Sequence, residues 1–205
     1  MAVIVLILSA PAAAVAPVVA ALSILAVLEF AFLLRKKTGR WTVPSLAALA
    51  AGSAVIACGL WTLAEIAARH GNVMLLYIVA IVKFSDVGGF AFGMTSARMM
   101  KGGNHKLCPS VSPGKSWEGL LGSVAFSCIV SCIFMPFTHF AVGKALLFGV
   151  VAALVGTAGD LAESRFKRWV GVKDSSALKI TNGMGGILDM IDSLLFAPAV
   201  LLALV

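Results

Sequence analysis

Charged side chains are scarce in this chain. Only 12% of its 205 residues are Asp, Glu, Lys or Arg, whereas 60% are apolar. A soluble domain of this size cannot cover its surface with so few polar groups. Runs of about 20 apolar residues are typical of helices that cross a bilayer. The composition therefore excludes an ordinary soluble protein and predicts an all-α, polytopic membrane bundle that forms a single domain over residues 1–205.

Several motifs of soluble enzymes are also missing. The four cysteines form no CxxC pair and no Cys/His pattern, so a zinc site is not expected. Cys128 and Cys132 share one helix face and are interpreted as small apolar packing residues. The GxxxxGK[ST] spacing is absent, which excludes a P-loop.

The excess of positive charge is concentrated in three loops. The chain has 16 Lys and Arg against 9 Asp and Glu, giving a net charge of +7. Most of the basic residues lie near 35–40, 98–115 and 165–179. Because these clusters separate apolar runs of membrane length and do not cover a soluble face, no nucleic acid partner is expected.

Six membrane spans account for the positions of the basic loops. We place them near residues 3–34, 42–66, 72–97, 119–138, 143–163 and 184–205. With the N-terminus outside, all three basic loops fall on the cytoplasmic side, in agreement with the positive-inside rule. The remaining connections are short and poor in charge.

The first span is the least regular. Pro11 and Pro17 interrupt it, and proline kinks a helix because it removes a backbone donor. A full span, a re-entrant segment followed by a helix from about Val18 to Leu34, and a signal peptide all stay open. Glu29 is interpreted as a carboxylate near the membrane interface.

An acid lies inside the third predicted span. An ionisable residue at membrane depth indicates a functional site. Lys83 and Asp86 share a helix face, so simple charge neutralisation is the alternative. Gly88, Gly89 and Gly93 would allow a ligand to approach the backbone closely, and tight helix packing is again the plainer alternative.

A basic turn rich in hydroxyl groups follows this span. Residues 112–116 read Ser-Pro-Gly-Lys-Ser. A lysine ammonium and the backbone amides of a glycine turn both suit an anion such as phosphate. An anion-binding loop and a solvated turn are both consistent with these residues.

Carboxylates gather on two helices near the C-terminus. Asp160, Ser164 and Lys167 are spaced to form one column of a helix, and Asp189 and Asp192 share a face near the start of the last span. Crowded carboxylates repel one another, whereas a hard divalent cation accepts oxygen ligands. The acids are therefore predicted to hold a metal ion, with capping or ion pairing to nearby basic residues as the alternative.

These motifs together resemble the phosphatidate cytidylyltransferases, also called CDP-diacylglycerol synthases. The C-terminal signature of that family is a serine, Lys-Arg, Lys-Asp, a Gly-x-Gly-Gly turn and two aspartates three apart. It is matched in order by Ser164, Lys167, Arg168, Lys173, Asp174, Gly183, Gly185, Gly186, Asp189 and Asp192. The upstream family stretch matches Asp86 and residues 106–119. The resemblance covers about residues 80–205, with 81–205 as catalytic spans and loops and 1–80 as weakly matched N-terminal spans.

The resemblance implies a Mg²⁺-dependent nucleotidyltransferase that makes CDP-diacylglycerol and pyrophosphate from CTP and phosphatidic acid. It leaves open a second metal ion or a monovalent cation. The implied metal ligands are Asp160, Asp189, Asp86 and Asp192. The implied catalytic residues are Lys167, Arg168, Lys173, Asp174 and Ser164. The implied substrate-binding residues are Ser112, Gly114, Lys115, Ser116, Gly183, Gly185 and Gly186. The expected location is a bacterial inner membrane with the active site on the cytoplasmic side.

Two positions depart from the family pattern. Met184 stands where the family often has histidine, and Met190 where it often has arginine. Neither methionine can donate a hydrogen bond to phosphate, so an inactive relative acting as a membrane scaffold stays open, as does a CTP-dependent lipid or polyprenol kinase. A transporter would not explain acids and glycines concentrated on one side. Apolar faces rich in small residues also permit a homodimer.

Overall fold

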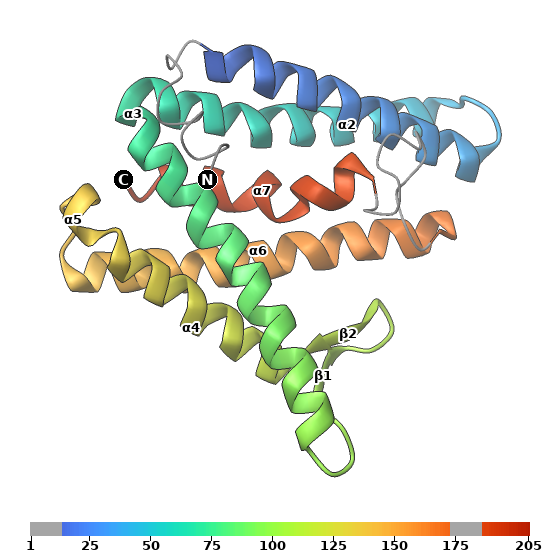
Figure 1. The fold of residues 1–205 in the computed structure, drawn as a ribbon. Coiled ribbons are helices and arrows are strands. Elements are labelled where there is room, and N and C mark those ends of the chain that lie inside the picture. Colours follow the sequence, from blue (N-terminus) through green and yellow to red (C-terminus); the bar gives the residue numbers. More distant parts are fainter. Residues whose placement is uncertain (1–13, 173–185) are drawn as a thin grey trace.

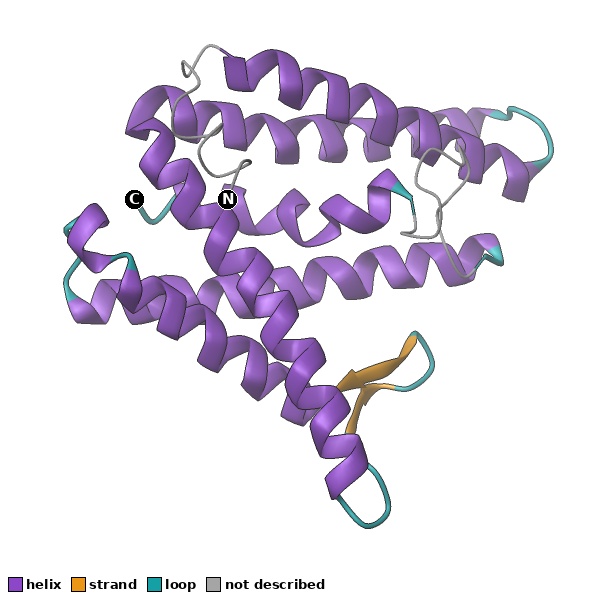
Figure 2. Cartoon of the chain, viewed as in Figure 1, coloured by secondary structure: helices purple, strands orange, loops and turns teal. Residues whose placement is uncertain are grey.

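The computed structural model describes residues 14–172 and 186–205, which are almost entirely helical (Figures 1 and 2). The helices are α2 (Val15–Thr38), α3 (Val43–Met99), α4 (Trp117–Ile133), α5 (Met135–Thr138), α6 (Val142–Val170) and α7 (Ile187–Leu202). Two short antiparallel strands, β1 (Lys106–Cys108) and β2 (Ser112–Ser116), connect α3 to α4. The predicted all-α membrane bundle is confirmed, and the hairpin is an addition that the sequence did not predict.

Helix α3 contains two of the predicted spans. Gly71 has φ 82° and ψ 170°, a non-helical conformation that glycine adopts most easily, and it divides the 57-residue helix. In Figure 1 the half before Gly71 runs beside α2, and the half after it runs diagonally across the molecule toward the hairpin. The boundary predicted near residues 66–72 is therefore a sharp bend within one helix.

Helices α2, α3 and α6 are each long and apolar enough to cross a membrane, and α4 is a shorter apolar helix. The chain is an integral membrane protein. Helix α2 begins at Val15, near the alternative start predicted at Val18, and the segment before residue 14 lies outside the described residues. Helix α6 continues to Val170, beyond the predicted end at residue 163. This extension keeps Ser164 and Lys167 on the same helix as Asp160.

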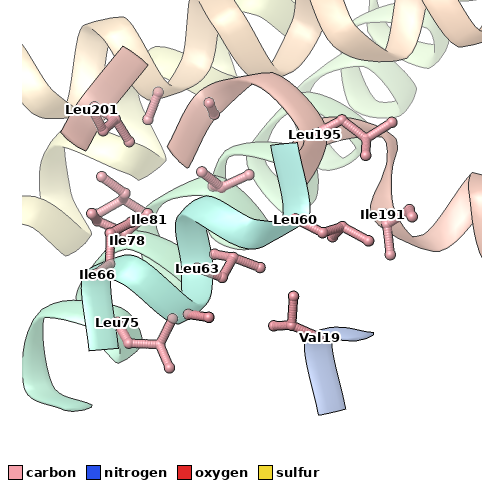
Figure 3. Packing of buried hydrophobic residues seen from close by; sticks show 14 of the residues in the cluster. Val19, Leu60, Leu63, Ile66, Leu75, Ile78, Ile81, Ile191, Leu195 and Leu201 are labelled. Carbon is pink, nitrogen blue, oxygen red and sulfur yellow. The ribbon is translucent and has the colours of Figure 1, made fainter. Parts of the chain in front are cut away.

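Helix α7 lies between the first half of α3 and α6 (Figure 1). Its apolar side chains form a buried cluster with those of α3, in which Leu60 and Leu63 of α3 accompany Leu195 and Leu201 of α7 (Figure 3). A Cβ atom added at Gly59 would collide with the Leu195 carbonyl. The two helices are therefore in backbone contact, which fixes the depth of α7 in the bundle.

Described parts of the three basic clusters lie close together. The Nζ atom of Lys37, at the end of α2, is 5.6 Å from the ring centroid of Trp169 near the end of α6. Arg168 donates through Nε to the carbonyl of Val111 in the hairpin at 3.4 Å. These contacts bring the three clusters together, as expected if all three face one side of the membrane.

Glycines bring the second half of α3 against α4. A Cβ atom added at Gly88 would lie 2.5 Å from the Gly122 carbonyl oxygen, and one added at Gly122 would lie 2.6 Å from the Gly88 carbonyl oxygen. Such a close approach is possible only because both residues lack a side chain. The packing interpretation of Gly88 is therefore confirmed.

We expect Gly88→Val to lower the midpoint of thermal unfolding in detergent. The added side chain meets backbone and the Phe126 ring, and overpacking of this kind typically costs about 1–3 kcal/mol. Gly143→Ala is the matched control, because a Cβ atom there meets nothing within 4 Å. Equal midpoints for the two variants would contradict the backbone contact.

Candidate active site

A cavity of about 450 Å³ opens between the second half of α3, the hairpin, α4 and α6. Its walls include Asp86 of α3, Lys115 of β2 and Asp160 of α6. The volume falls within the usual range of small-molecule sites in proteins. The cavity therefore brings together the two stretches of sequence that carry the predicted site residues, one containing Asp86 and Lys115 and the other containing Asp160.

An ion pair crosses this cavity. The Nζ atom of Lys115 lies 2.6 Å from Oδ2 of Asp160 and donates to the Thr157 carbonyl at 3.4 Å. The other carboxylate oxygen of Asp160, Oδ1, is buried and has no hydrogen-bond partner within the described part of the chain. A buried oxygen without a partner is costly, so this atom is suited to a cation or donor supplied by a ligand.

The hairpin holds the predicted phosphate loop in place. Lys106 pairs with Ser116 across the strands, and the Ser116 hydroxyl accepts the Gly119 amide at 3.1 Å, which caps α4. Ser112, Gly114 and Ser116 line the cavity together with Lys115. The structure thus brings all four predicted loop residues to one site.

A side-chain hydrogen bond supports the base of the hairpin. Nδ1 of His105 and Oε1 of Glu118 are 2.6 Å apart. The hydrogen bond from His105 lowers the pKa of Glu118 to about 2. Glu118 therefore stays ionised throughout the neutral range and keeps an acceptor for the backbone amide of His105, which lies 3.2 Å away.

Lys167 lies between two carboxylates. Its Nζ atom is 2.7 Å from Oε2 of Glu163 on the same helix and 2.5 Å from Oδ1 of Asp189 on α7. Oδ2 of Asp189 accepts the amide of Gly186 at 3.0 Å, at the start of α7. In this structure Asp189 is therefore ion-paired to Lys167 and caps the start of α7, which is the alternative to metal binding that the sequence left open.

Lys83 joins α3 to α7. Its Nζ atom is 3.3 Å from Oδ2 of Asp86, and it donates to Oγ of Ser193 at 2.9 Å and to the Met190 carbonyl at 3.0 Å. Ser193 in turn donates to Oδ2 of Asp86 at 2.9 Å. The intramembrane pair noted in the sequence is thus part of the same site and links it to the last helix.

Carboxylates of three helices lie near one another around this cavity. Asp86 of α3 and Asp160 of α6 both line it, and the backbone of Asp192 on α7 contacts Gly159, which precedes Asp160 on α6. Within residues 14–172 and 186–205, no three Asp, Glu, His or Cys side chains already form a metal-binding group. The donor chemistry nevertheless fits a hard divalent cation, since the ligands are carboxylate oxygens and Oδ1 of Asp160 is unpartnered in this part of the chain.

The remaining predicted residues are distributed as follows. Ser164 is half-buried on α6, between Asp160 and Lys167, and Arg168 contacts the hairpin. Gly186 is the N-cap of α7. Four predicted residues and one departure from the family pattern lie outside the described residues: Lys173, Asp174, Gly183, Gly185 and Met184.

Sequence reasoning did not identify the roles of three polar residues. Glu163 is buried beside Lys167. Asn104 lines the cavity, and its Nδ2 donates to the Gly93 carbonyl at 2.8 Å. Glu29, interpreted as a carboxylate near the membrane interface, has a buried side chain whose Oε2 accepts the Leu188 amide at 2.8 Å. The only signal for Glu29 in the sequence was a carboxylate inside an apolar run, which needs a partner but does not identify it.

Known proteins resemble this chain over long stretches. A phosphatidate cytidylyltransferase of Haemophilus influenzae is 42% identical over 131 residues, which are 61% of this chain and 43% of the relative. A protein of the same name from Staphylococcus aureus is 44% identical over 124 residues, or 60% of this chain and 45% of the relative. The chain spans less than half the length of these curated relatives. The model of the cytidylyltransferase family matches residues 1–205, and the chain therefore belongs to the cytidylyltransferase family.

Proposed function

We propose that the protein transfers a cytidylyl group from CTP to phosphatidic acid, releasing pyrophosphate and forming CDP-diacylglycerol. The observation that carries the proposal is the Lys115–Asp160 pair, which joins a loop suited to phosphate to a carboxylate of α6 across a cavity of about 450 Å³. The relatives that bear the name phosphatidate cytidylyltransferase support the same substrates.

The nucleotide phosphates would bind at the hairpin. Lys115 supplies a positive charge there, and Ser112, Gly114 and Ser116 supply hydroxyl and amide groups beside it. A bound triphosphate would compete with Asp160 for the Lys115 ammonium. Nucleotide binding would then free a carboxylate whose other oxygen already lacks a partner in the described chain.

Magnesium would be held by carboxylates at the junction of α3, α6 and α7. Asp160 and Asp86 line the same cavity, the backbone of Asp192 contacts α6 at Gly159, and Asp189 is one turn before Asp192 on α7. A bound Mg²⁺ ion would neutralise charge on the nucleotide phosphates. The proposed site also leaves room for a second metal ion or a monovalent cation beside Mg²⁺.

The lipid phosphate would act as the nucleophile. One of its oxygens forms a bond to the α-phosphorus of CTP, the bond from that phosphorus to the bridging oxygen breaks, and pyrophosphate leaves. The lipid phosphate is largely ionised at neutral pH, so the reaction needs no strong general base. The main requirement is positive charge that brings two anions together. Lys167, Arg168 and Lys173 are the proposed donors of this charge. Ser164, Asp174 and the glycines at 183, 185 and 186 are proposed to lie beside them in the site.

Lys83 bears on the departure from the family pattern at Met190. Its ammonium group contacts the Met190 carbonyl and the Ser193 hydroxyl, so α3 supplies a cation beside the backbone of that position. We propose that this cation serves the active enzyme, whose α7 carries no arginine there.

The active site would face the cytoplasm in a bacterial inner membrane. The basic ends of α2 and α6 and the hairpin lie together, and such clusters favour the cytoplasmic side. The headgroup of phosphatidic acid in the inner leaflet would then reach the acids at the same depth.

Purified protein in detergent is expected to transfer the label of α-³²P CTP to phosphatidic acid in the presence of Mg²⁺. Thin-layer chromatography of the extracted lipid measures the product, and EDTA should abolish its formation. Label from γ-³²P CTP should appear in pyrophosphate. Lipid labelled from the γ-phosphate would indicate a kinase, and an absence of transfer from either nucleotide would indicate an inactive relative.

We expect Lys115→Met and Asp160→Asn each to lower kcat/KM for CTP by roughly 100-fold, as is usual when one charge-stabilising group is removed. Lys144→Met is the matched control, because Lys144 contacts the exposed carbonyl of Val205 and lies outside the cavity lining. Initial rates with radiolabelled CTP provide the measurement. Full activity of either site variant would remove the ion pair from the mechanism.

A further inference from the structure

Glu29 is a fully buried carboxylate that the proposed reaction does not use. It lies in the middle of α2, an otherwise apolar stretch, and its side chain is 1% exposed. Its Oε2 atom accepts the backbone amide of Leu188 at 2.8 Å, across a sequence separation of 159 residues. A buried carboxyl group is costly unless it is hydrogen-bonded, and its bond to an amide of a distant helix indicates a structural role.

Leu188 lies in the first turn of α7, where backbone amides have no partner within the helix. In apolar surroundings each unpaired amide is costly, and a negative charge is favoured at the positive end of the helix dipole. Asp189 satisfies the amide of Gly186 from within α7. Glu29 satisfies the amide of Leu188 from another helix, and so ties the start of α7 to α2.

The next residue of α2 fixes that helix to α6. The ring of Phe30 stacks on the ring of Phe166, with 4.8 Å between centroids, and Phe166 immediately precedes Lys167. This stacking fixes the position of Glu29 relative to the part of α6 that carries Lys167. The hydrogen bond of Glu29 to the Leu188 amide then fixes the start of α7, and with it Asp189, relative to α6.

We infer that Glu29 is a positioning residue that, through the Leu188 amide, sets where Asp189 and Asp192 stand relative to Lys167 and Asp160. Its role in the reaction rests on the proposed function, whereas the contact itself does not. Misplacement of reacting groups by about 1 Å can lower a rate by about 100-fold. The described lining of the cavity contains no residue of α7, so loss of the contact should affect kcat far more than KM for CTP.

Two substitutions separate the contact from the charge. Glu29→Gln keeps an oxygen that can accept the amide, and Glu29→Leu removes the acceptor while retaining apolar bulk. Glu29→Asp keeps the charge but withdraws the acceptor by one methylene, and replaces Glu29→Leu if that variant fails to fold. Tyr77→Phe is the control, since it removes a buried hydrogen bond to Ser131 outside the proposed site.

Hydrogen–deuterium exchange of the full chain in detergent tests the contact, and initial rates test its role. In Glu29→Leu we expect amide exchange at the start of α7 to rise by about tenfold, the effect of losing one charge-assisted hydrogen bond. In the same variant kcat should fall at least tenfold, with KM for CTP within about threefold of wild type. Glu29→Gln should restore both, and Tyr77→Phe should change neither.

Each contrary result has a distinct meaning. Unchanged exchange in Glu29→Leu overturns the inference whatever the activity, as does faster exchange with an unchanged kcat. A Glu29→Gln variant that behaves like Glu29→Leu contradicts the acceptor role. A wild-type protein that transfers no cytidylyl group while its exchange responds as expected overturns the proposed function, and with it the role in the reaction, but leaves the contact between α2 and α7 standing.

Discussion

Ion pairs between lysines and aspartates of different elements are the interaction on which the site depends. Lys115 pairs with Asp160 and Lys167 with Asp189, while Lys83 bridges its own helix and α7. A single charge in apolar surroundings is strongly unfavourable, and removal of one partner leaves the other uncompensated. Asp86, Asp160 and Asp189 can therefore be gathered inside an apolar bundle because each has a lysine within reach.

The same ion pairs could exchange partners when ligands bind. A polyphosphate attracts ammonium groups and a divalent cation attracts carboxylates, so the two together would replace lysine–aspartate contacts with lysine–phosphate and aspartate–metal contacts. The divalent cation would offset part of the negative charge that the polyphosphate brings. The helices would keep their positions during this exchange, because those positions depend on backbone contacts such as that of Gly59 with Leu195.

Helical periodicity accounts for what the sequence could predict. It placed Asp160 and Lys167 on one face, and the lengths of the apolar runs placed a break between spans near Gly71, because both depend on residues close together in the chain. The Lys115–Asp160 pair spans 45 residues and the Glu29–Leu188 bond 159. Such contacts depend on how closely helices approach, which is set by the shape of both partners and not by the pattern of either one. The hairpin was missed for a related reason, since its short strands carry no alternation of apolar residues.

The contact of Gly88 with Gly122 closes one route into the bundle. With the two backbones in contact, an acyl chain has no room between α3 and α4 at that level. In the proposed reaction the lipid would therefore approach the cavity from another side, with its acyl chains outside the bundle and its headgroup inside.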